Sequence, residues 1–357
     1  MAGESEFPKS DGDVLYSSEV NSFNNSFNQL KLIFNTDLSN QDDYFNVFMD
    51  TFSDTSRYES GESSNIRVNT TAGFVGLDVD NTNQIYAADF TGVSRDGTYT
   101  ASETGNTSVT FDAGNDEEDF ERAAGGTAGG DNSILTLDAT YRDSSFIFKL
   151  DNFAGSTDGG TASTCVLIAH GITVTCSNGV SGWGATFSDG TNTFSRTSPT
   201  YIRISRAAGA TKTENSSDGS SWSTVTDWTY GAIGTANAAS IKIQANTGHL
   251  HTAACSFSLQ AWEVNGLYSS GHFVSTDEIP SNDAKSCIMF NDSTVGGSGS
   301  TIAYQASGDG NTYTTVTENN NTLITNGTEV RVKINFTSDT LENISPLSNS
   351  YGIIYGN

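Results

Sequence analysis

Apolar and polar residues alternate with a period of two along most of the chain. Ile202 and Ile204 alternate with Arg203 and Ser205, and the same pattern runs through residues 330–336. Such alternation predicts strands with one buried face and one wet face. Many short stretches of this kind, separated by turns rich in Gly, Asn and Asp, predict antiparallel sheets packed as β-sandwiches. The expected fold class is therefore all-β.

One turn phrase occurs twice. Residues 218–226 read DGSSWSTVT, and residues 309–317 read DGNTYTTVT. Asp-Gly is a strong hairpin signal, because Gly adopts positive φ at no steric cost. Each copy carries an aromatic residue three places after its Gly. The repeat predicts two β domains that each contain this hairpin.

A different period appears near the N-terminus. Ser17, Ser18 and Glu19 form a plausible helix start. Apolar residues then follow at spacings of three and four, a narrow stripe typical of a helix. Either a single helix packs on a domain, or the helix bundles with copies of itself, and we favour the bundle, as a trimer. The stripe consists of Val20, Phe23, Phe27, Leu30 and Phe34.

These patterns divide the chain into three parts. Residues 1–45 form an N-terminal arm with the short oligomerisation helix. Residues 46–265 form a large β-sandwich, and residues 266–357 form a smaller one. The boundary between the two sandwiches is placed at Asn265-Gly266.

The charge of the chain limits the classes of partner that it can bind. With 42 acidic and 16 basic residues, the formal net charge is -26, which repels nucleic-acid phosphates. No apolar run approaches the length of a membrane span. The first residues lack a basic region and an apolar region, so we expect synthesis in the cytoplasm without a signal peptide.

The four cysteines do not have the spacing of a zinc site. Cys165 and Cys176 flank a predicted hairpin with His170-Gly171 at its tip. A two-residue loop makes them a hydrogen-bonded opposite pair, a geometry that suits a disulfide less well than neighbouring sites. Free thiols are expected for that loop, and a bridge only with a longer loop or a bulge.

Signatures of catalysis are missing from the sequence. It has no G-x-S-x-G, P-loop or H-E-x-x-H motif, and no E-x-D-x-x-E carboxylate set, so we expect no enzyme. Asp78 and Asp80 alternate oxygen ligands as a calcium loop does, but the Gly at position six and the distal Glu are missing. They are a weak candidate Ca²⁺ site, and simple exposed acids are the alternative.

Aromatic residues beside turns are candidate sugar platforms, because a ring face can stack on the apolar face of a pyranose. The candidates are Trp183 and the pair Trp228 and Tyr230, with Asp227 to accept hydroxyl groups. Core positions are the alternative for each. For Trp222 and Trp262 we expect the core.

Three segments resemble known families. The I-x-I strand at 202–204, the turn after it and the S-x-D-G-x-x-W phrase resemble the concanavalin A-like, LamG-type β-sandwich. Residues 8–24, P-x-x-D-G-D-V-L-x-x-x-E-V-N-x-F-N, resemble the N-termini of tailed-virus tail fibres. The C-terminal part, closing with residues 351–355, resembles the small β-sandwich at the ends of phage and archaeal-virus tail or spike proteins.

The resemblances imply a tail fibre or spike on the virion surface. It would be held by its N-terminus to other virion proteins and would bind a host-surface glycan, as a homotrimer without membrane insertion. A capsid decoration or turret protein, a glycan depolymerase on the same fold and a cellular adhesin are the alternatives.

Overall fold

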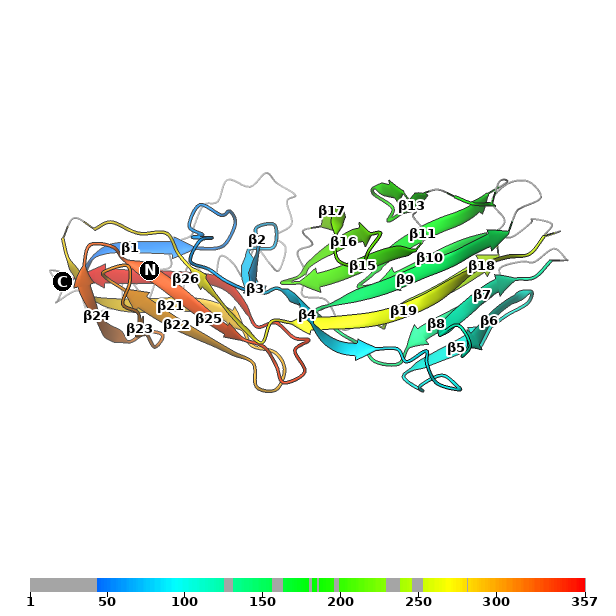
Figure 1. Ribbon diagram of the computed structural model, residues 1–357. Helices are drawn as coiled ribbons and strands as arrows, with labels where there is room; N and C mark the ends of the chain where they lie inside the picture. Colours follow the sequence, from blue (N-terminus) through cyan, green and yellow to red (C-terminus); the bar gives the residue numbers. More distant parts are fainter. Residues whose placement is uncertain are drawn as a thin grey trace, which may run out of the picture.

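A computed structural model describes residues 44–124, 131–155, 163–179, 182–184, 186–195, 199–228, 238–245, 253–280 and 282–356. Over these residues the regular structure consists of β-strands, and the named strand pairs are antiparallel, which confirms the predicted fold class. Figure 1 shows two β-sandwiches arranged end to end. Within the described residues, no helix has the length and apolar character that crossing a bilayer requires.

Two sheets face each other in the first sandwich. The front sheet contains, in spatial order, β17 (Ser223–Trp228), β16 (Ala210–Ser216), β15 (Thr200–Ala207), β9 (Ser144–Gly155), β19 (Cys255–Leu267), β7 (Glu117–Arg122) and β6 (Thr107–Asp112), with β4 (Val79–Ala87) also paired to β19. The back sheet contains β14 (Thr193–Ser195), β13 (Thr186–Ser188), β11 (Ile172–Gly179), β10 (Ser163–Ala169), β18 (Ser240–Ala245), β8 (Asn132–Leu137) and β5 (Tyr99–Glu103), with β12 (Gly182–Trp183) paired to β11.

The core of this sandwich lies between the two sheets, as the alternation predicts. Ile202 and Ile204 are fully buried in it, and Trp262 is 0% exposed. Because successive side chains of a strand point to opposite faces, Arg203 lies on the outer face of the front sheet. That outer face carries the candidate functional site.

The second sandwich is built from both ends of the described chain. One sheet contains β2 (Ile66–Asn69), β3 (Phe74–Leu77), β26 (Leu347–Gly356), β21 (Ala284–Thr294) and β24 (Asn321–Gly327), with β1 (Tyr44–Asp50) also paired to β26. The other contains β20 (Ser270–Val274), β25 (Arg331–Thr337), β22 (Thr301–Ser307) and β23 (Thr314–Thr315).

The predicted domain boundaries are therefore corrected. Val47 pairs with Ile354 and Phe48 with Ile353. The strands that precede Val79 therefore belong to the same sandwich as the C-terminal strands, although the prediction placed them in the large sandwich. The first sandwich, β4 to β19, is an insertion within the second. Alternation identifies a strand but says nothing about its partner, so the sequence pattern did not reveal this arrangement. Of the predicted arm 1–45, the last two residues begin β1, and residues 1–43 lie outside the described residues. These include the stripe at Val20, Phe23, Phe27, Leu30 and Phe34.

The cysteine hairpin has the two-residue loop considered from the sequence. Ala169 pairs with Ile172, Cys165 pairs with Cys176, and His170 and Gly171 form the loop with positive φ angles of 50° and 77°. Neither cysteine is in a disulfide, and both are buried. This register makes Cys165 and Cys176 a hydrogen-bonded pair, the geometry that favours free thiols.

We expect the cysteine thiols of the folded protein to resist alkylation. Burial and the nearby Cys176 raise the pKa of Cys165 well above its ordinary value, and burial raises the pKa of Cys287 to about 12. Since the thiolate is the reactive form, these thiols should stay inert at pH 9 in the folded protein. Alkylation and non-reducing peptide mapping should find all four thiols modified only after unfolding. A Cys165–Cys176 disulfide in the mapped peptides would contradict this.

Candidate functional site

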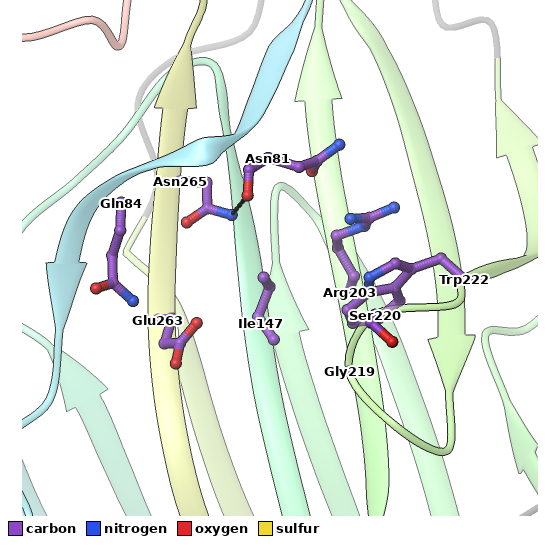
Figure 2. Close-up of a pocket in the computed structure, with 9 residues that line it drawn as sticks. All are labelled: Asn81, Gln84, Ile147, Arg203, Gly219, Ser220, Trp222, Glu263 and Asn265. Atoms are coloured by element: carbon purple, nitrogen blue, oxygen red, sulfur yellow. Dashed lines mark hydrogen bonds between the residues drawn. The ribbon is translucent and has the colours of Figure 1, made fainter.

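A hollow of 540 Å³ opens on the outer face of the front sheet (Figure 2). It lies over β15, β9 and β19 and is closed on its sides by β4 and by the turn between β16 and β17. Its lining contains one aromatic ring, one carboxylate, three amides and one guanidinium. The lining residues are Asn81, Gln84, Ile147, Arg203, Gly219, Ser220, Trp222, Glu263 and Asn265.

The floor of the hollow belongs to one row of residues across four strands, and the fourth member of the row, Glu214, lies beside the lining. Glu214 of β16 pairs with Arg203 of β15, Arg203 pairs with Ile147 of β9, and Ile147 pairs with Glu263 of β19. The four side chains share one face because they are directly opposite each other in register. Alternation on each strand therefore places this row, which is polar except for Ile147, on the face opposite the apolar core.

The Asp-Gly hairpin holds Trp222 over this row. Asp218 Oδ1 accepts hydrogen bonds from the backbone N–H groups of Ser221 (2.7 Å) and Ser220 (2.8 Å) and from the Ser216 hydroxyl (2.8 Å). These bonds hold the pKa of Asp218 well below its usual range. Gly219 adopts a φ of 74°, which a side chain would strain. The turn is thus fixed, and the half-buried Trp222 follows it directly.

Trp222 rests on Arg203, whose Cζ lies 4.2 Å from the ring centroid. Arg203 Nε donates to Glu214 Oε2 at 2.7 Å, and Lys212 Nζ reaches the other oxygen of Glu214 at 2.6 Å. Burial alone would raise the pKa of Glu214, but the hydrogen bonds from Arg203 and Lys212 outweigh it and lower the pKa. Arg203 is therefore an ion-paired support for the indole ring.

The opposite wall is polar and open. Asn265 Nδ2 donates to the backbone oxygen of Asn81 at 3.0 Å, which ties β19 to β4 beside the hollow. Glu263 is half-buried, Gln84 is exposed, and no described residue donates a hydrogen bond to the Glu263 carboxylate. In Figure 2, Glu263 and Gln84 lie on one side of Ile147, and Arg203 with Trp222 lies on the other. An apolar ring thus stands across the hollow from unengaged hydrogen-bonding groups.

Trp183 does not lie at a surface. It is 8% exposed, and its Nε1–H donates to the backbone oxygens of Ala154 (3.0 Å) and Ser256 (2.9 Å). Phe257 and Phe153 pack against its ring. The expectation of a sugar platform at Trp183 is corrected, because its ring faces are covered by the core.

Asp227 and Trp228 are separated by the strand that carries them. β17 extends through Trp228, so alternation applies, and Trp228 packs against the core while Asp227 lies on the other side. Asp227 forms an ion pair with Arg67 of the second sandwich. The structure therefore does not combine Asp227 and Trp228 into one surface platform. Tyr230 lies outside the described residues.

Sequence reasoning also assigned Trp222 wrongly, since we expected it in the core. It lies between the turn and the start of β17 at Ser223, where alternation does not yet apply. The S-x-D-G-x-x-W phrase was the available signal, because it places the ring on the residue after a fixed turn. Trp262, the other tryptophan expected in the core, is confirmed there.

The second copy of the phrase forms the same hairpin in the second sandwich, as predicted. Asp309 Oδ1 accepts hydrogen bonds from Thr312 N (2.7 Å) and Asn311 N (3.0 Å) and from Ser307 Oγ (2.8 Å). The Lys333 ammonium lies 5.5 Å from the Tyr313 ring centroid. Both sandwiches therefore use one device to lay an aromatic ring over a cation of the adjacent strand.

Asp78 and Asp80 accept hydrogen bonds from residues that follow them closely in the chain. Asp78 Oδ1 accepts from Val79 N at 2.8 Å, and Asp80 Oδ1 accepts from the backbone N–H (2.9 Å) and hydroxyl (2.7 Å) of Thr82. Burial raises the pKa of Asp78. Within the described ranges, three carboxylates gather on the β6–β7 hairpin, with ligand atoms within 4.8 Å of one another: Asp112, Glu117 and Asp119.

No family model matches the sequence, and the search of curated proteins finds no match. Solved structures align with about half of the chain. The carbohydrate recognition domain of Emp47p aligns at 11% identity and a TM-score of 0.35, over 52% of this chain and 98% of that one. The CBM2 module of the evolved Dit of Lactobacillus casei BL23 phage J-1 aligns at 9% identity and a TM-score of 0.37, over 52% and 96%.

A glycoside hydrolase family protein of Mycobacterium thermorestibile also aligns, at 12% identity and a TM-score of 0.34, over 50% of this chain and 99% of that chain. This finding corrects the expectation that the protein is not an enzyme. That expectation rested on missing sequence motifs, and a glycoside hydrolase family protein is among the structures that align with the chain. The correction removes an exclusion and assigns no reaction to this chain.

Proposed function

We propose that the protein binds glycans in the hollow beside Trp222. The observation that carries the proposal is the half-buried indole ring, fixed by a hydrogen-bonded turn and facing unengaged polar groups across the floor. Sugars have apolar C–H faces and polar edges, and a ring beside carboxylate and amide groups matches both. The volume of the hollow lies in the range of about 300–1,000 Å³ that ligand pockets usually have.

Replacing Trp222 tests the proposal. Trp222→Ala should weaken glycan binding at least about tenfold, because buried aromatic anchors carry much of the binding energy at such sites. Folding should lose only the cation–π contact with Arg203, worth about 0.5–1 kcal/mol. Glycan-array binding and thermal melting of the full chain measure the two effects.

Trp222→Phe is the matched control, since it keeps an aromatic ring on the same turn and should retain part of the binding. Glycan binding by Trp222→Ala at the wild-type level would refute the assignment of the site. A Trp222→Ala protein that unfolds would show that the ring is needed for folding instead.

A second candidate function, glycan cleavage, is supported by one observation: a carboxylate, Glu263, lies at the wall of the same hollow. Glycoside cleavage commonly uses two carboxyl groups on either side of the scissile bond. Sizing bound glycans after incubation separates the two functions. Shortened products that disappear with Glu263→Gln would establish cleavage.

For the biological setting, we propose a virion appendage that attaches to a host-surface glycan. The support is the resemblance of residues 8–24 to tail-fibre N-termini and of the C-terminal part to tail and spike sandwiches. Antibody labelling of purified particles tests it. Label projecting from the particle supports a fibre or spike, label lying flat on the capsid supports a decoration protein, and absence from particles contradicts both.

We also propose that the N-terminal stripe drives self-association as a trimer. Removing residues 1–40 should leave folded, monomeric sandwiches, because the described sandwiches have their own cores. Light scattering of the truncated and full chains measures the masses. An oligomer that survives the truncation would show that another surface holds the copies together.

A further inference from the structure

We infer that the hollow selects glycans without negative charge, and that Glu263 sets this selectivity. The inference rests on the proposed glycan binding at this site. It goes further by naming the chemical class of the sugar and the residue that discriminates. Such selectivity depends on which charges at the site are already paired and which can meet a ligand.

The one cation among the lining residues is already ion-paired and largely covered. The Arg203 side chain is 8% exposed, with Nε on Glu214 at 2.7 Å and Trp222 over its guanidinium. The carboxylate or sulfate of an acidic sugar is bound most strongly by a cation that gives it two charge-assisted hydrogen bonds. Arg203 already donates to Glu214 and is covered by the ring.

The two lysines nearby on the same face are either ion-paired already or lie further from the hollow. Lys212 is ion-paired with Glu214 at 2.6 Å. Lys149 pairs with Tyr201 one row further along β9, and its ammonium lies 5.8 Å from the Tyr201 ring centroid. Neither residue lines the hollow. Arg203, which is ion-paired with Glu214, is therefore the single cation among the lining residues.

The open charge in the lining is negative. Glu263 is half-buried and receives no hydrogen bond from a described residue, and the exposed Gln84 lies beside it on the wall (Figure 2). A carboxylate accepts hydrogen bonds from sugar hydroxyl or ammonium groups and repels another anion at short range. The net charge of -26 adds to this repulsion over longer distances.

Matched glycan pairs test the inference. An array carrying neutral oligosaccharides beside their sulfated, sialylated or uronic-acid counterparts, and N-acetylated beside de-N-acetylated oligomers, is probed with the full chain. We expect neutral and amino-sugar members to bind, and each acidic counterpart to bind at least tenfold more weakly. Calorimetry on one chosen pair then gives the affinity ratio.

Glu263→Gln isolates the discriminating charge, because the amide keeps the size and one acceptor oxygen. It should raise affinity for the acidic member at least tenfold and change that for the neutral member less than threefold. Glu121→Gln is the control: it removes one negative charge from β7, away from the lining, and should leave the affinity ratio unchanged.

The outcomes distinguish this inference from the proposal beneath it. If acidic and neutral members bind equally and Trp222→Ala abolishes both, glycan binding stands and the selectivity is overturned. If Glu121→Gln lowers the affinity ratio of neutral to acidic glycans as much as Glu263→Gln does, the overall negative charge of the protein excludes acidic glycans. The role of Glu263 is then overturned. If no glycan binds, the glycan-binding proposal fails and the selectivity fails with it.

Discussion

Removing the last strand, β26, should unfold the second sandwich and leave the first one folded. β26 lies inside its sheet, paired with β1, β21 and β3. Its inward side chains Tyr351, Ile353 and Tyr355 are buried in the core of that sandwich. Loss of a large buried side chain costs about 2–5 kcal/mol, and three together approach the total stability of about 5–15 kcal/mol of a typical domain.

Calorimetry measures this result. The full chain should show the melting of both sandwiches, and the chain ending at residue 346 should retain only the melting of the first. Ser350→Ala, a small change on the same strand, serves as the control and should keep both. If the truncated chain loses both transitions, the first sandwich depends on the second for its stability, contrary to our expectation.

Trp262→Ala should cost the first sandwich about 3–5 kcal/mol. Trp262 is 0% exposed, and its ring centroid lies 5.7 Å from that of Phe148 and 6.1 Å from that of Tyr99. Truncation to Ala leaves a cavity between the two sheets that these neighbours cannot fill. Urea unfolding, followed by a signal specific to the first sandwich, gives the change in free energy of unfolding.

Trp262→Phe is the informative partner of that variant. No described group accepts a hydrogen bond from the Trp262 Nε1–H, and a buried unpaired donor costs about 1–3 kcal/mol. Phe removes this donor and keeps most of the ring, so it should be far milder than Ala. A Phe variant as unstable as the Ala variant would mean that the N–H has a partner, such as a buried water.

The strands and their buried faces could be predicted because alternation is a local property. Alternation with their polar neighbours predicted which side chains face the core, and the structure places Ile202, Ile204 and Trp262 there. The hairpins at Asp218 and Asp309 could be predicted for the same reason, since Asp-Gly turns depend on only a few adjacent residues.

The site could not be predicted in the same way. Its floor needs Glu214, Arg203, Ile147 and Glu263 to be in register across four strands, and register is set by the packing of the whole sheet. Aromatic residues beside turns were a poor guide by themselves. Trp183 and Trp222 both lie near turns, yet one ring is covered by the core and the other lines the hollow.

The pairing of β1 with β26 also determines how the protein carries mechanical load. Tyr44 pairs with Gly356, and these ends of β1 and β26 lie at the end of the molecule farthest from the first sandwich (Figure 1). If the arm is anchored and a ligand is held in the hollow, tension runs along the strands. Hydrogen bonds between antiparallel strands lie perpendicular to that direction, so the pull shears the β1–β26 ladder and loads its bonds together. A pull across the strands would break them one after another, at lower force.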